Sequence, residues 1–118
     1  MDFSQNKPIY KQIIDYAFAK ILNGEWQPGQ RVASVRELAV EMTVNTNTVL
    51  KAYESMQNDG IIYPRRGMGY YLSEDARAGV EKAKRNEFFA TTLPSLKQEM
   101  ELLGITPEEL LSHLTAKL

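Results

Sequence analysis

The 118-residue chain contains no cysteine and a single histidine, His113. The missing thiols exclude disulfides, thiolate zinc sites and cysteine nucleophiles. One histidine without a cysteine or a nearby pair of acids leaves nothing from which a catalytic triad or metal cluster could assemble. We therefore expect a protein that is not an enzyme and that needs no cofactor and no metal.

Long apolar runs and targeting signals are also missing. The chain has no apolar run of the roughly eighteen residues that a membrane span requires. Asp2 and Gln5 stand where the basic segment of a signal peptide would begin. The sequence thus predicts a cytoplasmic protein without a membrane partner.

Neither sign of charge dominates, since 14 Lys and Arg residues oppose 15 Asp and Glu residues, for a net charge of −1. Residues 1–72 hold eight basic and seven acidic residues, net +1, and residues 73–118 hold six and eight, net −2. Affinity for phosphate depends on where charges lie and not on their sum. The balance argues only against strong indiscriminate binding to nucleic acid.

Capping signals and apolar residues at helical spacing predict three helices in the first half of the chain. The first spans residues 9–23. The second, about 34–42, opens with a capping box formed by Ser34 and Glu37. The third follows a brief link, with Asn45 as its cap, and ends before Gly60. Two short helices joined so tightly form a helix-turn-helix unit.

Two β-prone segments, 61–63 and 70–72, bracket a glycine-containing loop at 64–69. This pattern predicts a hairpin, or wing, whose strands pair with each other and with a residue or two near Val32. The expected fold is mainly α. Residues 1–72 form a winged helix-turn-helix of three helices plus a β-hairpin, and residues 73–118 form a short α-helical dimerisation region.

The second region carries an apolar seam at alternating four- and three-residue steps, a spacing that lets one helix pack on another at a shallow angle. Pro94 interrupts it, which favours a kinked or tightly linked pair of helices. We expect the seam to form a homodimer interface, although it could instead fold back on its own winged domain. The expected interface residues are Val80, Phe89, Leu93, Leu96, Met100 and Leu103.

The leading turn of the third helix carries polar side chains suited to base edges. Asparagine can bond adenine at N6 and N7 together, and threonine can donate to phosphate or meet a thymine methyl. The residues expected to contact DNA here are Asn45, Thr46, Asn47, Thr48 and Lys51. The alternative for Asn45 and Thr46 is that they only cap the helix.

Two further groups are expected at the same DNA surface. Ser34 and Arg36 begin the second helix, where free N–H groups favour a phosphate, unless Arg36 merely pairs with a surface acid. Arg65, Arg66 and Gly67 lie in the wing turn. They resemble a minor-groove or backbone clamp, with a solvated basic turn as the alternative.

These motifs together resemble those of the GntR family of bacterial transcription regulators. The similarity covers about residues 8–72. Its elements are Pro8/Tyr10, Gly24/Pro28/Gly29, Ser34/Arg36/Glu37/Leu38/Ala39, Thr48/Val49 and Arg65/Gly67/Gly69/Tyr70/Tyr71. The remainder is similar to the YtrA-type branch, which implies a homodimeric repressor. Ala33, Thr46 and Leu50 depart from residues usual in the family or its branches, so operator sequences of relatives do not transfer.

The function expected from these observations is a sequence-specific DNA-binding transcriptional regulator, acting as a repressor. Its homodimer would bind an inverted repeat in double-stranded DNA, with a recognition helix in the major groove and the wing at the adjacent minor groove or backbone. The alternative is a winged-helix protein-interaction module without DNA binding. The segment after Leu72 is too short to enclose a pocket of about 300 Å³ or more within one protomer, which leaves a small effector between protomers open.

Overall fold

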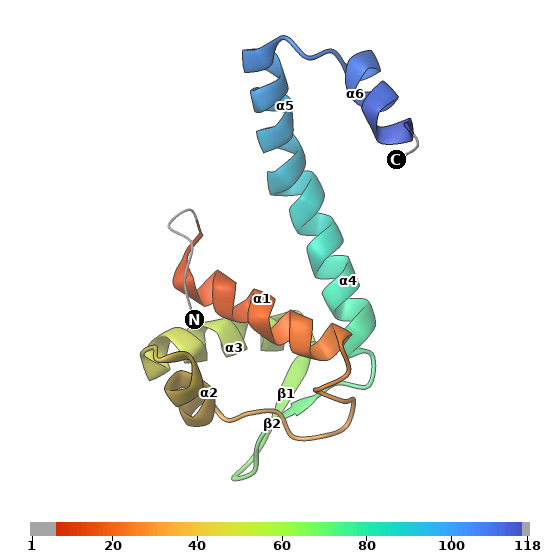
Figure 1. Ribbon diagram of the computed structural model, residues 1–118. Helices are drawn as coiled ribbons and strands as arrows, with labels where there is room; N and C mark the ends of the chain where they lie inside the picture. Colours follow the sequence, from red (N-terminus) through yellow and green to blue (C-terminus); the bar gives the residue numbers. More distant parts are fainter. Residues whose placement is uncertain (1–6, 117–118) are drawn as a thin grey trace. The chain divides into compact units, whose positions relative to one another are not determined.

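The computed structural model describes residues 7–116, and its elements follow one another as shown in Figure 1. They are α1 (Ile9–Leu22), α2 (Val35–Met42), α3 (Thr46–Asn58), β1 (Ile62–Arg65), β2 (Gly69–Leu72), α4 (Ala76–Glu87), the π-helical segment η1 (Phe88–Thr92), α5 (Leu93–Leu103) and α6 (Pro107–Thr115). The chain divides into two compact units, Met1–Lys82 and Ala83–Leu118. None of the helices within residues 7–116 is both long and apolar enough to cross a membrane.

The first unit is built on α1, α2 and α3, whose apolar faces converge on one core. Figure 1 shows α1 lying across α3, with α2 beside them and the hairpin below. Each helix contributes a stripe at three- and four-residue spacing, as the sequence predicts. The stripe residues of α1 and α3 that are buried are Ile13, Ala17, Phe18, Ile21, Val49, Ala52, Tyr53 and Met56.

The capping box predicted at the start of α2 is confirmed. The backbone N–H of Glu37 donates to Ser34 Oγ at 3.0 Å, and the N–H of Ser34 donates to Glu37 Oε1 at 3.1 Å. At its other end α2 closes on Thr43, which has a left-handed conformation with φ of 56°. A β-branched residue rarely adopts this conformation, and no glycine marks the turn in the sequence.

Tyr53 of α3 connects the helices to the hairpin. Its ring is fully buried and meets the ring of Tyr70 edge-on, with 5.2 Å between the centroids. Its hydroxyl donates to the carbonyl oxygen of Ala33 at 2.6 Å. Burial raises the pKa of this phenol well above its ordinary value of 10.0, so Tyr53 is a neutral hydrogen-bond donor under physiological conditions.

The wing is an antiparallel hairpin in which Ile62 pairs with Leu72 and Arg65 with Gly69. The expected contact near Val32 is confirmed, because Val32 donates to the Tyr70 carbonyl at 3.0 Å. The expectation that the first strand stops at residue 63 is wrong. Pro64 lies inside β1, and it is tolerated there because β1 is an edge strand whose outer side needs no N–H donor.

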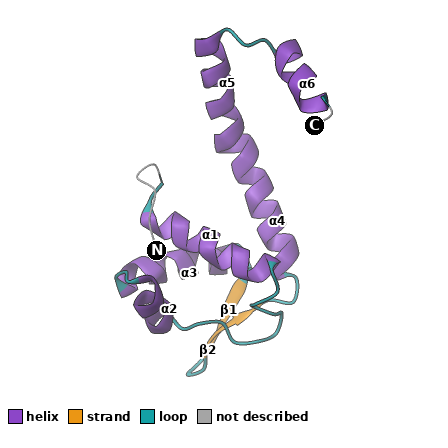
Figure 2. Cartoon of the chain, viewed as in Figure 1, coloured by secondary structure: helices purple, strands orange, loops and turns teal. Residues whose placement is uncertain are grey.

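Helical backbone continues from α4 through η1 into α5, and Figure 2 shows no loop between them. Thr92 and Leu93 both have right-handed helical angles. Pro94 lacks an N–H, and its ring crowds the carbonyl four residues earlier. The wider π-helical turn immediately before it accommodates this crowding without breaking the helix. Gly104, at φ of 68°, then ends α5, and Thr106 caps α6 by accepting the N–H of Glu109 at 3.1 Å.

Candidate nucleic-acid interface

The candidate interface lies in the unit Met1–Lys82 and includes the leading turn of α3. Asn45 is the N-cap residue of α3, and its Oδ1 accepts the N–H of Asn47 at 2.8 Å. Its amide nitrogen, which donates two hydrogen bonds, is not used by this cap. Asn45, Thr46 and Asn47 are exposed and Thr48 is half-buried. A capping role for Asn45 is therefore compatible with a second role as a donor toward DNA.

Ser34 and Arg36 occupy the leading turn of α2. The Ser34 hydroxyl accepts the capping bond from Glu37, which leaves its hydrogen as a donor. Arg36 is exposed. The two acids considered as its partners bond elsewhere, Glu37 with Arg31 and Glu41 with Tyr16. Within residues 7–116 the Arg36 guanidinium forms no ion pair or hydrogen bond.

Lys51 is held by an aromatic ring that the sequence did not associate with it. Its Nζ lies 4.2 Å from the centroid of the Tyr10 ring, at the start of α1. Tyr10 is half-buried and Lys51 is exposed. The contact joins two helices that lie far apart in sequence, so local spacing could not indicate it.

The wing presents its two arginines differently. The Arg65 guanidinium carbon lies 4.8 Å from the centroid of Tyr71, and that ring stacks on Tyr63 with 6.0 Å between centroids. Arg66 lies in the turn after β1, next to Gly67, whose φ of 71° suits glycine. Arg65 is therefore fixed on the strand pair, and Arg66 is exposed at the tip without an ion pair in the described part of the chain.

Arg31, like Tyr10, was not among the residues that the sequence predicted for this interface. It forms a β-bridge with Tyr71, pairs with the Glu37 carboxylate, and lies beside Gly69, where an added Cβ would come within 3.9 Å of Arg31 Nε. These contacts tie the leading turn of α2 to the base of the wing. They bring the Ser34–Arg36 turn and the wing into one connected region of the unit.

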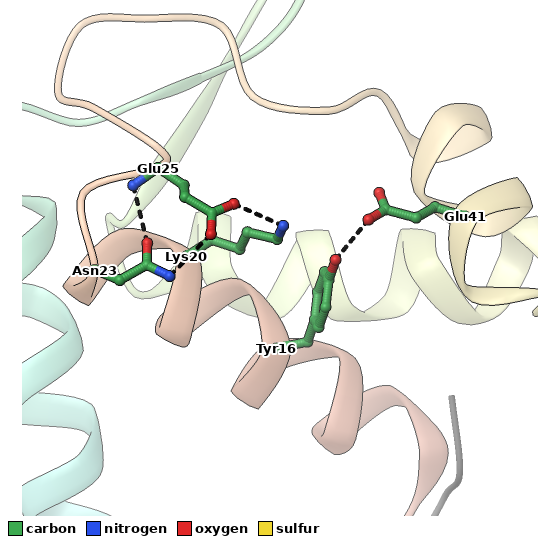
Figure 3. Close-up of polar contacts among 5 residues, drawn as sticks. All are labelled: Tyr16, Lys20, Asn23, Glu25 and Glu41. Atoms are coloured by element: carbon green, nitrogen blue, oxygen red, sulfur yellow. Dashed lines mark hydrogen bonds and ion pairs between the residues drawn. The ribbon is translucent and has the colours of Figure 1, made fainter.

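A polar network on α1 fixes the position of α2 (Figure 3). Tyr16 Oη donates to Glu41 Oε1 at 2.6 Å, and this hydrogen bond raises the pKa of Tyr16. Lys20 Nζ lies 5.0 Å from the Tyr16 ring centroid and bonds Glu25 Oε2 at 2.8 Å. That bond raises the pKa of Lys20 and lowers the pKa of Glu25. The charges of this network are thus satisfied internally.

The cations of the unit fall into two classes. Lys7, Lys20, Arg31 and Arg77 each pair with a carboxylate. The four cations expected to contact DNA have no carboxylate partner among residues 7–116, nor do Lys11 and Lys82. Those four are Arg36, Lys51, Arg65 and Arg66.

The residues expected at a dimer interface differ in how far they are exposed to solvent. Val80 is fully buried and belongs to the core of the unit Met1–Lys82. Among the expected interface residues, Val80 is therefore the one whose side chain is already covered by its own protomer. Phe89 and Leu103 are 54% and 67% exposed, and Leu93, Leu96 and Met100 are half-buried.

An open groove of about 450 Å³ runs along part of the second unit. Phe89, Leu93 and Pro94 form its apolar wall, and Lys97, Gln98 and Glu101 add polar groups. The groove is open to solvent within one protomer. It overlaps the expected seam at Phe89 and Leu93.

The chain resembles known proteins in sequence and structure. Residues 9–72 match the family described as bacterial regulatory proteins, gntR family. The HTH-type transcriptional repressor YtrA of Bacillus subtilis (strain 168) is 42% identical over 84 residues, 71% of this chain and 65% of YtrA. A solved GntR family transcriptional regulator from Listeria monocytogenes is 38% identical, with a TM-score of 0.73, over 95% of this chain and 96% of that one.

A third likeness is to the DNA-binding domain of AraR, solved in complex with the operator ORR3. It is 25% identical with a TM-score of 0.56, and the match covers 62% of this chain and 86% of that one.

These findings confirm the winged helix-turn-helix fold and the resemblance to YtrA-type regulators that the motifs indicated. The family match extends over 64 of the 118 residues, from the start of α1 to the end of β2. The protein is thus a DNA-binding transcriptional regulator, and the chain belongs to the gntR family of bacterial regulatory proteins.

Proposed function

We propose that the protein is a repressor that binds an inverted-repeat operator as a homodimer. In each protomer α3 enters a major groove, and the wing contacts the adjacent minor groove or backbone. The observation that carries the proposal is the division of cations described above. Paired cations hold the fold together, whereas Arg36, Lys51, Arg65 and Arg66 lack carboxylate partners among residues 7–116.

The roles of the polar side chains follow from their places. Asn45, Thr46, Asn47 and Thr48 stand at the leading turn of α3, the part of a recognition helix that reads base edges. Lys51 is one turn farther along. Ser34 and Arg36 stand at the leading turn of α2, where free N–H groups and the helix dipole favour a phosphate. The wing arginines and Gly67 would lie over the neighbouring backbone or minor groove.

Dimerisation is proposed because the second unit has an uncovered apolar surface. On the expected seam, Phe89 and Leu103 are 54% and 67% exposed, and Leu93, Leu96 and Met100 are half-buried. Exposed apolar surface of this kind marks sites of interaction between protein chains. A two-fold dimer would place two α3 helices about 34 Å apart, on successive turns of one DNA face. Repression is supported by the likeness to YtrA, which is a transcriptional repressor.

The proposal is tested by selecting bound duplexes from random DNA and measuring affinity by fluorescence anisotropy at several salt concentrations. Selected sequences should contain inverted half-sites with centres about 10 base pairs apart. The double variant Arg65→Ala/Arg66→Ala should bind more weakly, and its salt slope should fall by about 0.9 for every phosphate that the wing no longer neutralises.

Lys82→Ala is the matched control, because Lys82 is an exposed cation of the same unit and has no ion pair among the described residues. Its affinity and slope should equal those of the unaltered protein. If the wing variant keeps the full slope, the wing does not contact phosphate. If the selected DNA contains only single half-sites, the dimeric mode of binding is wrong. A reporter whose expression falls when the regulator is deleted would contradict repression.

A further inference from the structure

The contact between Lys51 and Tyr10 assigns a role to a side chain outside the helix-turn-helix. The ammonium of Lys51 lies 4.2 Å above the ring of Tyr10, within the range of a cation–π interaction. No carboxylate among residues 7–116 pairs with Lys51. The ring is therefore the feature of the described structure that fixes the end of this lysine side chain.

A lysine that binds DNA ordinarily loses much of the rotamer freedom of its four-carbon stem. A stem already held in one direction loses less on binding, and affinity rises accordingly. An aromatic face suits this role better than an acid does. It holds the ammonium through the ring quadrupole but leaves the full positive charge available to a phosphate or guanine.

We propose that Tyr10 is a positioning residue for DNA binding, whose ring directs Lys51 toward the DNA from the start of α1. The inference rests on the proposed function, since it requires that Lys51 contact DNA. It assigns the effect to the face of the ring. The hydroxyl of Tyr10, which forms no hydrogen bond within the described residues, is not required.

Arg65 and Tyr71 form a comparable pair, but both belong to the wing hairpin, where strand pairing already fixes the arginine backbone. Tyr10 and Lys51 come from different helices, α1 and α3. A double-mutant cycle between them therefore reports on a tertiary contact and not on local strand geometry.

The test measures affinity for the selected duplex with Tyr10→Leu, Tyr10→Phe, Lys51→Met and the double variant Tyr10→Leu/Lys51→Met. Tyr10→Leu should weaken binding roughly two- to tenfold, the effect expected when one lysine side chain must be ordered on binding. Tyr10→Phe keeps the ring face and should bind as the unaltered protein does. In the Lys51→Met background, Tyr10→Leu should have no further effect.

The salt dependence of DNA binding distinguishes the loss of the Lys51 charge from the loss of its positioning by Tyr10. Lys51→Met should lower the salt slope by about 1 per protomer, because one phosphate is no longer neutralised. Tyr10→Leu should keep the slope, because the charge is still present, although it is less well directed. A purely structural role of Tyr10 would weaken binding equally in both backgrounds, and that result would overturn the inference.

A spectroscopic measurement keeps the proposal testable if Tyr10→Leu folds poorly. In the free protein, the ε-methylene protons of Lys51 should be shifted upfield by the Tyr10 ring, and the shift should persist in Tyr10→Phe. Lys11 and Lys82 provide unshifted references. Absence of the shift in the unaltered protein would overturn the inference directly. If Lys51→Met changes neither affinity nor slope, the role of Lys51 in the proposed function fails, and Tyr10 has nothing to position.

Discussion

The two units of the chain handle apolar side chains in opposite ways. In Met1–Lys82 three helices and a hairpin enclose a core in which many side chains, Ile13, Leu38, Val49 and Ile61 among them, are completely covered. In residues 83–116 no side chain is buried. The large apolar side chains of Phe89, Leu102, Leu103 and Leu114 are all more than half exposed. The first unit can be stable from its own packing. The second has helical order, and its large apolar side chains remain exposed.

The contrast extends to polar groups. The first unit uses ion pairs and hydrogen bonds such as Tyr16–Glu41 and Arg31–Glu37 to fix its helices, and other cations of this unit have no carboxylate partner among residues 7–116. Such a unit leaves exposed cations available to an anionic ligand. The second unit offers apolar surface, which suits an interface between protein chains.

The largest effect is expected from a matched pair of Leu→Ala substitutions, one in each unit. Leu38 is fully buried and Leu103 is 67% exposed. Leu38→Ala should lower the free energy of unfolding by about 2–5 kcal/mol, because the substitution removes buried apolar surface and leaves a cavity. Leu103→Ala should change that of the isolated protomer by less than about 0.5 kcal/mol.

Urea unfolding followed by circular dichroism at low protein concentration provides the measurement. Low concentration is needed because a dimer adds concentration-dependent stability. If Leu38→Ala and Leu103→Ala lower the free energy of unfolding equally, the contrast between the two units is wrong, because Leu103 would then belong to a core in the second unit.

The next effect concerns association. If the seam forms the interface, Leu103→Glu places one unpaired carboxylate per protomer in an apolar contact, which costs on the order of 3 kcal/mol or more. The dimer dissociation constant should then rise more than about a hundredfold. Sedimentation at micromolar concentration measures this shift.

Leu102→Glu is the matched control. Leu102 is 82% exposed and adjacent in sequence, but it lies off the seam defined by Phe89, Leu93, Leu96, Met100 and Leu103. It should therefore leave the dimer intact. Dissociation by both variants, or by neither, would contradict an interface formed by the seam.

The fold of the first unit could be predicted well from local signals. The capping box at Ser34, the cap at Asn45 and Gly60 after α3 predicted the start of α2 and both ends of α3 to within about a residue. Such signals act between residues a few positions apart, so the sequence displays them directly. The exposure of Asn47 and Lys51 could likewise be deduced, because both residues lie outside the apolar stripe of α3.

What the sequence did not reveal depends on neighbours in space. The left-handed Thr43 and the strand position of Pro64 are imposed by the elements around them. The partners of Lys51 and Arg31 come from distant segments. Val80 continues the spacing of the seam but is covered within its own unit. Periodicity identifies an apolar face, and only the fold determines what covers it.

The smallest expected effect tests whether the connection between α2 and the wing depends on charge. Hydrogen bonds from the Ser34 N–H and the Ser34 hydroxyl to the Glu37 carboxylate, together with the nearby charge of Arg31, lower the pKa of Glu37 below its ordinary value of 4.5. A carboxylate whose pKa is lower in the folded state stabilises the fold above the unfolded pKa, and this stabilisation disappears as the pH falls through the folded value. Glu37→Gln keeps a capping side chain but removes the charge.

The unaltered protein should therefore melt at a higher temperature than Glu37→Gln near pH 7, and the gap should narrow at an acidic pH below the ordinary carboxyl pKa of 4.5. Glu109→Gln is the matched control in the second unit, since the Glu109 carboxylate accepts no hydrogen bond within residues 7–116, and it should melt with the unaltered protein at both values. If the difference in melting temperature between the unaltered protein and Glu37→Gln is the same at both pH values, the charge of Glu37 does not stabilise the connection between α2 and the wing.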